Sequence, residues 1–549
     1  MIRIEIKGEV ASILGPFKIE FLRTISKLSG RKAWYGSKSV NVEASASNIQ
    51  ILKQSGWEFE WIDNSGLLKE IYELERMATQ HHAASVIETD YKPRVPYLPH
   101  MDHCLGISWE RKAYALFLEM GLCKTSITIH NFGILFKKHR ITGVIIFAPK
   151  GVHRQWIAEQ IPEHLDSSIK LNMVLWDKRA KYTTNELFKP GVLNVFALNI
   201  DAVRTEAGQI AAAMFVRIHS GHVFIVVDES HDIKDYSSER TREVIQIGEH
   251  CDYRRILTGT PLGKSLADIW SQMMFLDPKI IGINYLVVFK SRFCELGGFG
   301  HKEIVGSKNI EEFYQLIAPH CYRLTKAEAI DLPPKLPGRR SYDMDTKTQK
   351  HYDNLKHSFM TELDNNELVD TASALGCVIK LQQLLSGFVT KADRTYERIS
   401  TQRAQIVLDM TRQINGQCIV WSRFIEDINI LKEVFESEYG DDYCGLIDID
   451  LFKTRKKKYA FLNPASGGTG LNLQSGGCQD AIYFNNSTRA IHRWQSEDRL
   501  HRMGATGTIN IWDLFCYRSV DQGIFQNIKD KKDLSDLVLD DIRKLIIGS

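Results

Sequence analysis

The stretch Leu116–Thr125, LFLEMGLCKT, decides the fold that the sequence predicts. An apolar run over Ala113–Leu118 indicates a buried parallel strand, and a helical pattern follows over Ser126–His130. A strand, a tight loop, Lys-Thr and a helix together hold a nucleotide triphosphate, because N–H groups at the helix N-terminus face the phosphates. The lysine adds a positive charge, and the threonine hydroxyl binds Mg²⁺. The alternative is an ordinary strand-to-helix turn that carries a surface lysine.

The composition is that of a globular protein with more than one domain: 549 residues, 44% hydrophobic and 25% charged. The formal net charge of +3 neither requires nor excludes nucleic acid as a partner. Ten cysteines without a CxxC pair argue against a zinc ribbon or a disulfide framework. No signal peptide or apolar run of transmembrane length is found. We therefore expect no membrane contact and a cytoplasmic location, in the nucleoid or a host cell, or a nuclear one if the source is eukaryotic.

Between residues 96 and 280, apolar strands alternate with helical patterns, as in a doubly wound parallel sheet. The expected strands are Val144–Pro149, Leu193–Leu198, Phe224–Asp228 and the first part of Arg254–Pro261. Two acids, Asp228 and Glu229, end the third of them, and ligands bind at the carboxyl ends of such strands. There Asp228 would hold Mg²⁺ through water and Glu229 would deprotonate an attacking water. The alternative for this pair is an N-cap and a surface acid.

The flanking regions carry weaker signals. Residues 1–62 predict a small α/β module, in which Trp34 and Tyr35 would stack on bases beside a basic face or belong to the core. Residues 264–395 read as mostly helical, with an extended linker over Leu332–Pro337. The expected segments are strands at 3–10, 32–42 and 57–62 and helices at 17–28, 45–54, 66–84, 266–275, 310–317, 348–363 and 372–385.

A second α/β unit is expected from about residue 396. Its strands would cover 417–422, 458–462, 481–484 and 508–513. A helix over Ile491–Arg502 would place Arg499 and Arg502 on one face. The basic run Lys453–Lys458 would face DNA or solvent, with a nuclear signal as a further reading.

Seven segments, in order, resemble the motifs of superfamily 2 helicases, and in detail those of the Swi/Snf-type ATPases. They are MGLCKT (motif I, 120–125), FAPKGVHRQW (Ia, 147–156), VVDESH (II, 226–231), LTGTP (III, 257–261), WSRF (IV, 421–424), NPASGGTGLNL (V, 463–473) and QSEDRLHRMG (VI, 495–504). The N-terminal pattern GRKAW…VNV…NIQILKQSGW is similar to the HARP-type domain found beside some DNA-remodelling motors.

The resemblance implies an α/β protein with two RecA-like parallel-sheet lobes, helical insertions and a small N-terminal α/β domain. The expected domains are 1–62 (HARP-like), 63–95 (helical connector), 96–265 (lobe 1), 266–395 (helical insertions and linker) and 396–549 (lobe 2). ATP with Mg²⁺ would bind between the lobes.

The resemblance also implies a role for individual residues. ATP would be bound by Met120, Gly121, Leu122, Cys123, Lys124, Thr125, Ser126, Asp228, His231 and Gly470, and the metal by Thr125 and Asp228. Glu229 would be the base, Arg499 and Arg502 the candidate arginine fingers, and Gln495 would face the γ-phosphate. His231 and the turn Thr258–Thr260 would couple the γ-phosphate to lobe movement. Nucleic acid would be contacted by Lys150, Gln155, Trp156, Thr258, Gly259, Thr260, Arg423, Thr469 and Asn472.

Four positions depart from the family's pattern. Cys123 replaces a glycine of motif I, Met101 stands where the adenine-reading motif has glutamine, and Lys264 and Ala505 alter the ends of motifs III and VI. The expected function is a monomeric, ATP-dependent translocase on double-stranded, and in particular branched or forked, DNA, with sequence-independent binding. The alternatives are a DNA-binding scaffold whose ATPase is impaired by Cys123, and a strand-separating DNA or RNA helicase.

Overall fold

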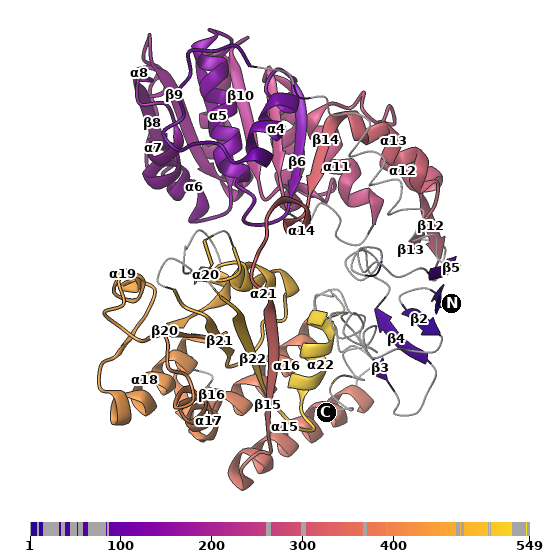
Figure 1. The fold of residues 1–549 in the computed structure, drawn as a ribbon, viewed down its shortest axis with the longest axis vertical. Coiled ribbons are helices and arrows are strands. Elements are labelled where there is room, and N and C mark those ends of the chain that lie inside the picture. The colour runs from indigo at the N-terminus through magenta and orange to yellow at the C-terminus, as the bar shows by residue number, and fades with distance from the viewer. Residues whose placement is uncertain are drawn as a thin grey trace. The chain divides into compact units, whose positions relative to one another are not determined.

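The computed structural model describes residues 2–7, 10–14, 32–33, 39–43, 52, 59–63, 84, 87–259, 265–297, 303–365, 371–391, 393–467, 473, 477–502, 504–505, 507–529 and 545. The chain divides into two compact units, Met1–Thr325 and Lys326–Ser549, which are described separately (Figure 1). The finer domain limits at residues 62, 95, 265 and 395 stay predictions.

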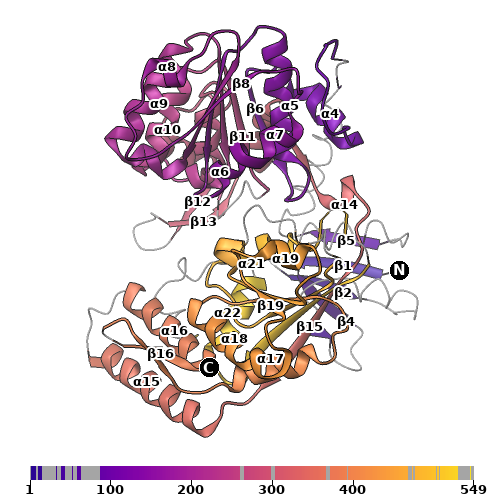
Figure 2. The same cartoon turned by 90° about the vertical axis from the view of Figure 1, so that its left-hand side faces the viewer.

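The first unit is organised around a seven-stranded parallel sheet. Its spatial order is β14 (Cys321–Leu324), β6 (Ala113–Leu118), β11 (Tyr253–Leu257), β10 (Val223–Asp228), β7 (Gly143–Ala148), β9 (Leu193–Asn199) and β8 (Leu171–Leu175). Helices α4 (Pro99–Ser108), α5 (Lys124–Lys137) and α7 (Ile161–His164) cover one face. Helices α9 (Glu206–Ile218) and α10 (Glu239–Glu249) cover the other (Figure 2).

Burial on both faces explains why the central strands read as continuous apolar runs. Every residue of β10 is buried. Ile225 and Val227 pack into the same core as α9 and α10, whereas the ring of Phe224 meets that of Phe132 on α5, with 5.9 Å between centroids. The predicted strands of this lobe are confirmed, and β6 has the predicted bounds.

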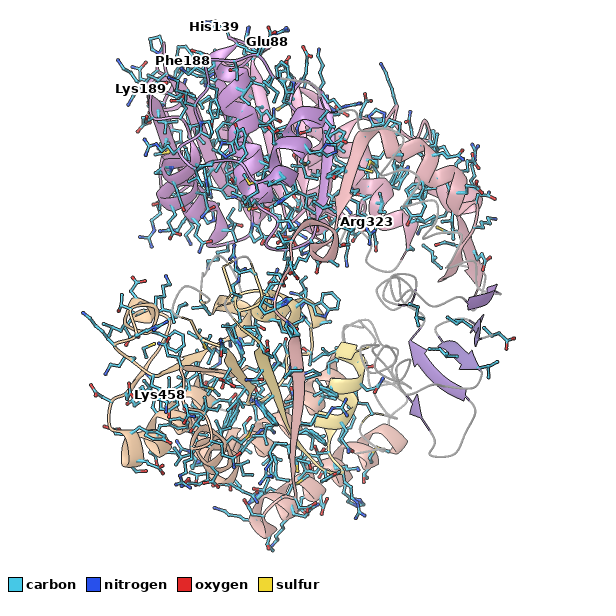
Figure 3. All side chains as sticks on the ribbon, in the orientation of Figure 1. Glu88, His139, Phe188, Lys189, Arg323 and Lys458 are labelled. Carbon is cyan, nitrogen blue, oxygen red and sulfur yellow. The ribbon has the colours of Figure 1, made fainter. Side chains whose placement is uncertain are left out.

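Two strands of this sheet, β8 and β14, are not predicted from the sequence. Strand β8 was not predicted at all. Strand β14 lies inside the region expected to be mostly helical, which corrects that expectation. Its four residues include the exposed Arg323 (labelled in Figure 3), and so short a charged edge strand has no apolar run to reveal it.

The remaining described elements of this unit are smaller. An N-terminal mixed sheet has the order β3 (Lys32–Ala33), β4 (Ser39–Glu43), β2 (Val10–Leu14), β1 (Ile2–Lys7) and β5 (Phe59–Asp63). It confirms strands at 3–10, 32–42 and 57–62 and adds β2, which the sequence pattern does not predict. Apart from Leu52 and Ala84, the helices predicted at 17–28, 45–54 and 66–84 lie outside the described residues. Further elements are α6 (Val152–Gln155), a π-helix (Trp156–Gln160), α8 (Thr184–Leu187), α11 (Leu266–Leu276), α12 (Leu286–Phe293), β12 (Cys294–Gly297), β13 (Glu303–Ser307) and α13 (Ile310–Ile317).

A buried arginine joins α4 and α5 to the sheet. The guanidinium of Arg255 on β11 donates to the carbonyls of Ser108 (2.8 Å) and Arg111 (2.6 Å) and to Asn131 Oδ1 (3.0 Å). Burial lowers its pKa to about 9, because these partners are neutral oxygens.

We expect Arg255→Met to destabilise the first unit by about 3 kcal/mol or more, because it leaves several buried acceptors unpaired. Arg204→Met is the control: that side chain is 62% exposed, and its ion pair with Asp201 is 3.9 Å long. We expect the control to cost less than about 1 kcal/mol. Urea unfolding measures both; an equal effect of the two variants would contradict this role of Arg255.

The second unit contains a six-stranded parallel sheet. Its order is β15 (Lys335–Tyr342), β22 (Ile509–Cys516), β21 (Asp480–Tyr483), β18 (Cys418–Trp421), β20 (Tyr459–Leu462) and β19 (Tyr443–Cys444). Alternate residues of β18 enter two different cores: Cys418 and Val420 pack with α17 (Gln402–Thr411) and α18 (Ile425–Tyr439), and Ile419 and Trp421 pack on the opposite face. The two parallel sheets confirm the predicted α/β class.

Other described elements of this unit are α14 (Lys326–Ala329), α15 (Thr346–Asn365), α16 (Thr371–Ser386), β16 (Phe388–Thr390), β17 (Tyr396–Arg398), α19 (Ile449–Lys453), α20 (Pro464–Gly467), α21 (Ala490–Glu497) and α22 (Val520–Lys529). Two expectations need correction. The extended linker is in part strand β15, at the edge of the sheet, where Pro337 is tolerated. The helix expected over Ile491–Arg502 ends at Glu497. No described helix is long and apolar enough to cross a membrane.

Candidate nucleotide site and its relatives

Four neighbouring strands bring the predicted motifs of the first unit to one edge of the sheet. Strands β6, β11, β10 and β7 are adjacent and parallel, so their carboxyl ends lie side by side. Motifs I, III, II and Ia follow these strand ends in that order. Ligands of open α/β sheets bind at this kind of edge. The structure therefore brings together the site residues that the sequence predicts for this lobe.

The loop of motif I makes a sharp turn into α5. Gly121 has φ 84°, and Cys123 is in the left-handed region at φ 60° and ψ 30°, directly before the helix. The side chain of Lys124 is nearly buried, and its Nζ donates to the carbonyl of Leu118 at 2.8 Å. Met120, Gly121 and Thr125 are partly exposed. This is a turn of the kind that binds phosphate, with its lysine held against its own loop.

Two predicted contacts of this loop face the interior instead of a ligand. Leu122 is fully buried. Ser126 is 4% exposed, and its Oγ lies 3.4 Å from His130 Nε2. The side chains of Leu122 and Ser126 therefore pack in the interior beneath the loop of motif I. Any contact that these residues make with ATP would come from their backbone.

The left-handed backbone at Cys123 explains why glycine suits this position: a residue with a Cβ pays about 1 kcal/mol or more to adopt it. We expect Cys123→Gly to lower the Kd for ATP by up to about fivefold, the gain when a loop that relaxes from this backbone without ATP no longer takes on about 1 kcal/mol of strain as ATP binds. Cys123→Ser keeps the Cβ and should leave the Kd unchanged. Titration with a fluorescent ATP analogue measures both variants. Equal tightening by glycine and serine would contradict the backbone explanation.

The carboxylate of Asp228 is buried at the end of β10. Its Oδ2 accepts a hydrogen bond from the indole N–H of Trp156 at 2.9 Å, and its Oδ1 accepts one from the N–H of Glu229 at 3.0 Å. Burial, followed by the charge of Glu229, raises the pKa of Asp228, whereas the Trp156 bond and the charge of Lys124 oppose this change. The contacts of Asp228 thus do not fully offset the cost of burying its negative charge.

The position of Trp156 differs from the predicted one. The resemblance implies that Trp156 contacts nucleic acid, but its side chain is 1% exposed and its indole N–H donates to Asp228. Trp156 begins the short π-helix, an arrangement that is common at functional sites. Lys150 and Gln155, from the same motif, are exposed and partly exposed, as a surface role requires.

Glu229 and His231 form a pair after the strand. Glu229 is in the left-handed region at φ 53° and ψ 56°, a backbone conformation that costs free energy for a residue with a Cβ and is typical of functional sites. Its Oε2 lies 3.3 Å from His231 Nδ1. Although burial lowers the pKa of His231, the Glu229 carboxylate reverses this effect and raises it. His231 is therefore placed to hold the carboxylate of Glu229.

The turn of motif III lies against motif I. Thr258 is fully buried, and its N–H donates to the carbonyl of Leu116 at 3.2 Å. A Cβ added to Gly259 would lie 3.2 Å from the backbone nitrogen of Met120. This contact supports a coupling role for the turn more than a direct one on nucleic acid. Thr260 lies outside the described residues.

The start of α4 shows how the adenine-reading motif has changed. Met101 is 3% exposed and packs inward. The neighbouring His100 hydrogen-bonds the Leu122 backbone, and its Nε2 is buried without a partner. Burial lowers the pKa of His100, which therefore stays neutral. The missing glutamine is evident from the sequence, whereas the position of this imidazole beside the loop of motif I is not.

In the second unit, motif VI spans α21 and the turns after it. Gln495 is buried, and Arg499 and Arg502 are partly exposed beyond the helix end. The helix is anchored by Arg493, which makes a bidentate ion pair with Asp513 and lies 3.4 Å from the centre of the Tyr483 ring. The arginines are thus carried by turns on a firmly packed helix.

The other predicted residues of this unit are placed as follows. Arg423 hydrogen-bonds Gln382 and Thr488, so its guanidinium is held within the unit. Thr469, Gly470 and Asn472 of motif V lie outside the described residues.

Two lysines of the basic run Lys453–Lys458 have acidic partners within the second unit. Lys453 pairs with Asp450 at 3.0 Å, and Lys457 pairs with Asp441 at 2.9 Å. Lys458, labelled in Figure 3, lies over the ring of Tyr459 at 5.3 Å. These contacts are compatible with a solvated loop, one of the three expected readings, and the choice among them stays a prediction.

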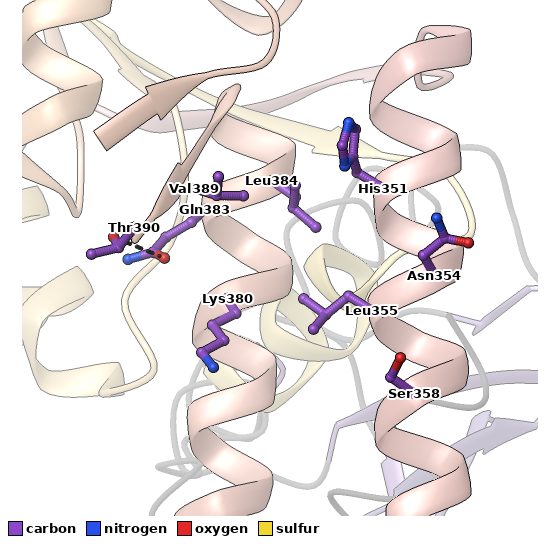
Figure 4. A pocket seen from close by; sticks show the side chains of 9 residues that line it. All are labelled: His351, Asn354, Leu355, Ser358, Lys380, Gln383, Leu384, Val389 and Thr390. Carbon is purple, nitrogen blue, oxygen red and sulfur yellow. Dashed lines mark hydrogen bonds between the residues drawn. The ribbon is translucent and has the colours of Figure 1, made fainter. Parts of the chain in front are cut away.

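A pocket of about 320 Å³ lies in the second unit between α15, α16 and β16 (Figure 4). It contains none of the motif residues. Its lining consists of His351, Asn354, Leu355, Ser358, Lys380, Gln383, Leu384, Val389 and Thr390.

Comparison with known proteins places the chain in a family. The model of the SNF2-related domain matches residues 72–387. Among curated proteins, the chain is 23% identical over 474 residues to the SWI/SNF chromatin-remodeling complex subunit snf22 of Schizosaccharomyces pombe, covering 79% of this chain and 27% of that protein. It is 23% identical over 439 residues to an uncharacterized ATP-dependent helicase of Mycoplasma pneumoniae, covering 76% and 39%. The chain spans less than half the length of these relatives.

Among solved structures, the Sulfolobus solfataricus SWI2/SNF2 ATPase core in complex with dsDNA is similar, with 20% identity and a TM-score of 0.39, covering 84% of this chain and 99% of that one. The family match itself covers more than half of the chain and includes motifs I to III. The chain therefore belongs to the SNF2-related family, the Swi/Snf-type branch of the superfamily 2 ATPases that its motifs indicate.

Proposed function

We propose that this chain hydrolyses ATP to move along double-stranded DNA, and that branched or forked DNA is its substrate. The observation that carries the proposal is the edge where four neighbouring strands end. There the sharp turn before α5, the buried carboxylate of Asp228 and the carboxylate of Glu229 beside His231 follow adjacent parallel strands. Phosphoryl transfer depends on positioning and charge stabilisation, and this edge supplies both.

Within this site the residues have separate tasks. The amides before α5 and Lys124 bind the phosphates of ATP. Glu229, oriented by His231 at 3.3 Å, accepts the proton of the attacking water. Trp156 holds Asp228 in position from behind. Arg499 or Arg502, from motif VI, stabilises the charge that builds on the transferred phosphoryl group.

The residues present fit a magnesium ion. The carboxylate of Asp228 is buried and accepts hydrogen bonds from two neutral N–H groups, those of Trp156 and Glu229, so a cation beside it would supply compensating charge. Thr125 offers a partly exposed hydroxyl at the start of α5. These two residues would hold the metal, which would neutralise charge on the phosphates.

Movement on DNA follows if hydrolysis requires the two units to close on ATP and product release lets them open. The turn of motif III, packed against motif I, would transmit the state of the γ-phosphate. Lys150 and Gln155 would contact the DNA backbone, which fixes position without reading sequence. The small N-terminal sheet, with its HARP-like pattern, would direct the motor to branched DNA, as a monomer in the nucleoid or host cytoplasm.

Two assays separate this proposal from its alternatives. We expect the chain to displace a third strand from a DNA triplex in the presence of ATP, because translocation on duplex DNA strips that strand. A strand-separating helicase would instead unwind a forked duplex. A scaffold with an impaired loop would do neither, and would gain ATPase activity on Cys123→Gly. Unwinding of the fork without displacement of the triplex would contradict the proposal.

A further inference from the structure

The first residue of the second unit binds the turn that carries the motif VI arginines. Lys326 directly follows Thr325, the last residue of the first unit. Its side chain is 7% exposed, and its Nζ pairs with Asp498 and donates to the carbonyl of His501 at 2.8 Å. Lysine is almost never so buried unless its charge is matched. The contact of Lys326 with Asp498 and His501 is therefore a buried, charge-matched interaction and not a solvent-exposed ion pair.

The residues that follow Lys326 continue this contact. The carbonyl of Pro333 lies 2.8 Å from His501 Nε2, and Lys335 pairs with Glu497 at 2.9 Å. Glu497 also accepts from Arg493 at 2.7 Å. Although burial raises the pKa of Glu497, Lys335 and Arg493 lower it to about 2, so the carboxylate is ionised. The segment 326–335 is thus attached to the end of α21 at several points.

These contacts matter because the arginines lie beyond the helix. α21 ends at Glu497, and Arg499 and Arg502 occupy the turns that follow. Lys326 holds the side chain of Asp498 and the carbonyl of His501, the residues directly before each arginine. A catalytic side chain needs placement within about 0.5 Å, which turns outside a helix do not guarantee by themselves.

We propose that Lys326 is a positioning residue for the motif VI arginines: it fixes Asp498 and His501 so that Arg499 and Arg502 are oriented for ATP hydrolysis. This inference rests on the proposed function, in which those arginines stabilise the transferred phosphoryl group. Lys326 is joined by one peptide bond to Thr325, the last residue of the first unit. A displacement of Thr325 would therefore be transmitted through Lys326 to the turn that carries the arginines. The same lysine would then link unit movement to the catalytic arginines.

The kinetic test compares Lys326→Met with Lys326→Arg and with Lys391→Met as a control. Lys391 forms an exposed ion pair with Glu397 in the same unit, at 3.1 Å. We expect Lys326→Met to lower kcat of the DNA-stimulated ATPase between about tenfold and about 100-fold, because misplacement of a catalytic group has effects of this size. The KM for ATP should change little, arginine should restore most of the rate, and the control should match the wild type.

A combined variant shows whether the lysine acts through the arginines. In the Arg499→Ala, Arg502→Ala background, Lys326→Met should change the residual rate by less than about twofold, because positioning absent groups has no effect. An additional loss as large as in the wild type would overturn the proposal. So would a raised KM for ATP with unchanged kcat.

A second measurement does not depend on turnover. Amide hydrogen exchange over residues 496–502 should be faster in Lys326→Met than in the wild type, and unchanged in Lys391→Met. If the wild type hydrolyses no ATP, the proposed function fails. The exchange result still tests whether Lys326 holds the turn that contains Asp498 and His501. Unchanged exchange over 496–502 in Lys326→Met would overturn the inference even if the ATPase is active.

Discussion

Glu229→Gln is expected to lower kcat of the DNA-stimulated ATPase by about 10²–10⁴-fold, the usual contribution of a general base, while ATP still binds. The side chain keeps its size and its place after β10, but its amide cannot accept the proton of the attacking water. ATP binding depends instead on the turn before α5 and on Lys124, which this substitution leaves intact. Steady-state turnover and titration with a fluorescent ATP analogue give the two quantities separately.

Asp232→Asn is the matched control for this substitution. It makes the same change from carboxylate to amide three residues away, at a side chain that lies 3.9 Å from Arg240. The control should keep nearly the wild-type rate. If Glu229→Gln retains turnover, Glu229 is not the base. If both variants lose turnover equally, the effect is one of local charge or folding and not of proton transfer.

Arg499→Ala or Arg502→Ala is expected to have the largest effect, a loss of about 10³–10⁵-fold in kcat for the residue that acts as arginine finger. The reason is that charge on the transferred phosphoryl group grows in the transition state, so its removal affects kcat more than ATP binding. Both arginines lie in the turns that follow α21, and the two single variants decide between them.

Arg489→Ala serves as the control for the arginine variants, because this exposed arginine directly precedes α21 and has no proposed catalytic task. Its kcat should match the wild type. Single-turnover rates at saturating ATP give the comparison free of product release. Retention of turnover within about tenfold by both Arg499→Ala and Arg502→Ala would exclude an arginine finger in motif VI, given the size of that effect.

The strands that carry the site were predictable because they are buried on both faces. β6, β7 and β10 read as nearly continuous apolar runs, and such runs mark central parallel strands, whereas β11 carries Arg254 and Arg255. The edge strands were not predictable in this way. β14 and β15 carry arginines, and β15 contains a proline, so their sequences resemble linkers.

The site residues likewise differ in how far the local sequence predicts them. Motif spacing identified Lys124, Asp228 and Glu229, because their chemistry depends on adjacent loop positions. The burial of Trp156 was not predicted, because an aromatic residue near basic ones in motif Ia is as compatible with a DNA surface as with the core. Its hydrogen bond to Asp228 joins residues 72 positions apart.

Lys326 could not be found from the sequence, because nothing in its local pattern points to Asp498, 172 residues further along the chain. The helix expected over 491–502 was extended too far for a related reason. Its periodicity continues through SEDRLHR, but the pairing of Asp498 with Lys326 stabilises a turn there.

The measurement that tests the central claim most directly is the ATPase rate of the wild-type chain against a panel of nucleic acids: none, single-stranded DNA, linear duplex, forked DNA and RNA. A motor that moves on duplex DNA and prefers branches should be stimulated by the linear duplex, and most strongly by the fork, with little response to single strands or RNA. A rate that no duplex raises above the value without nucleic acid would contradict the account.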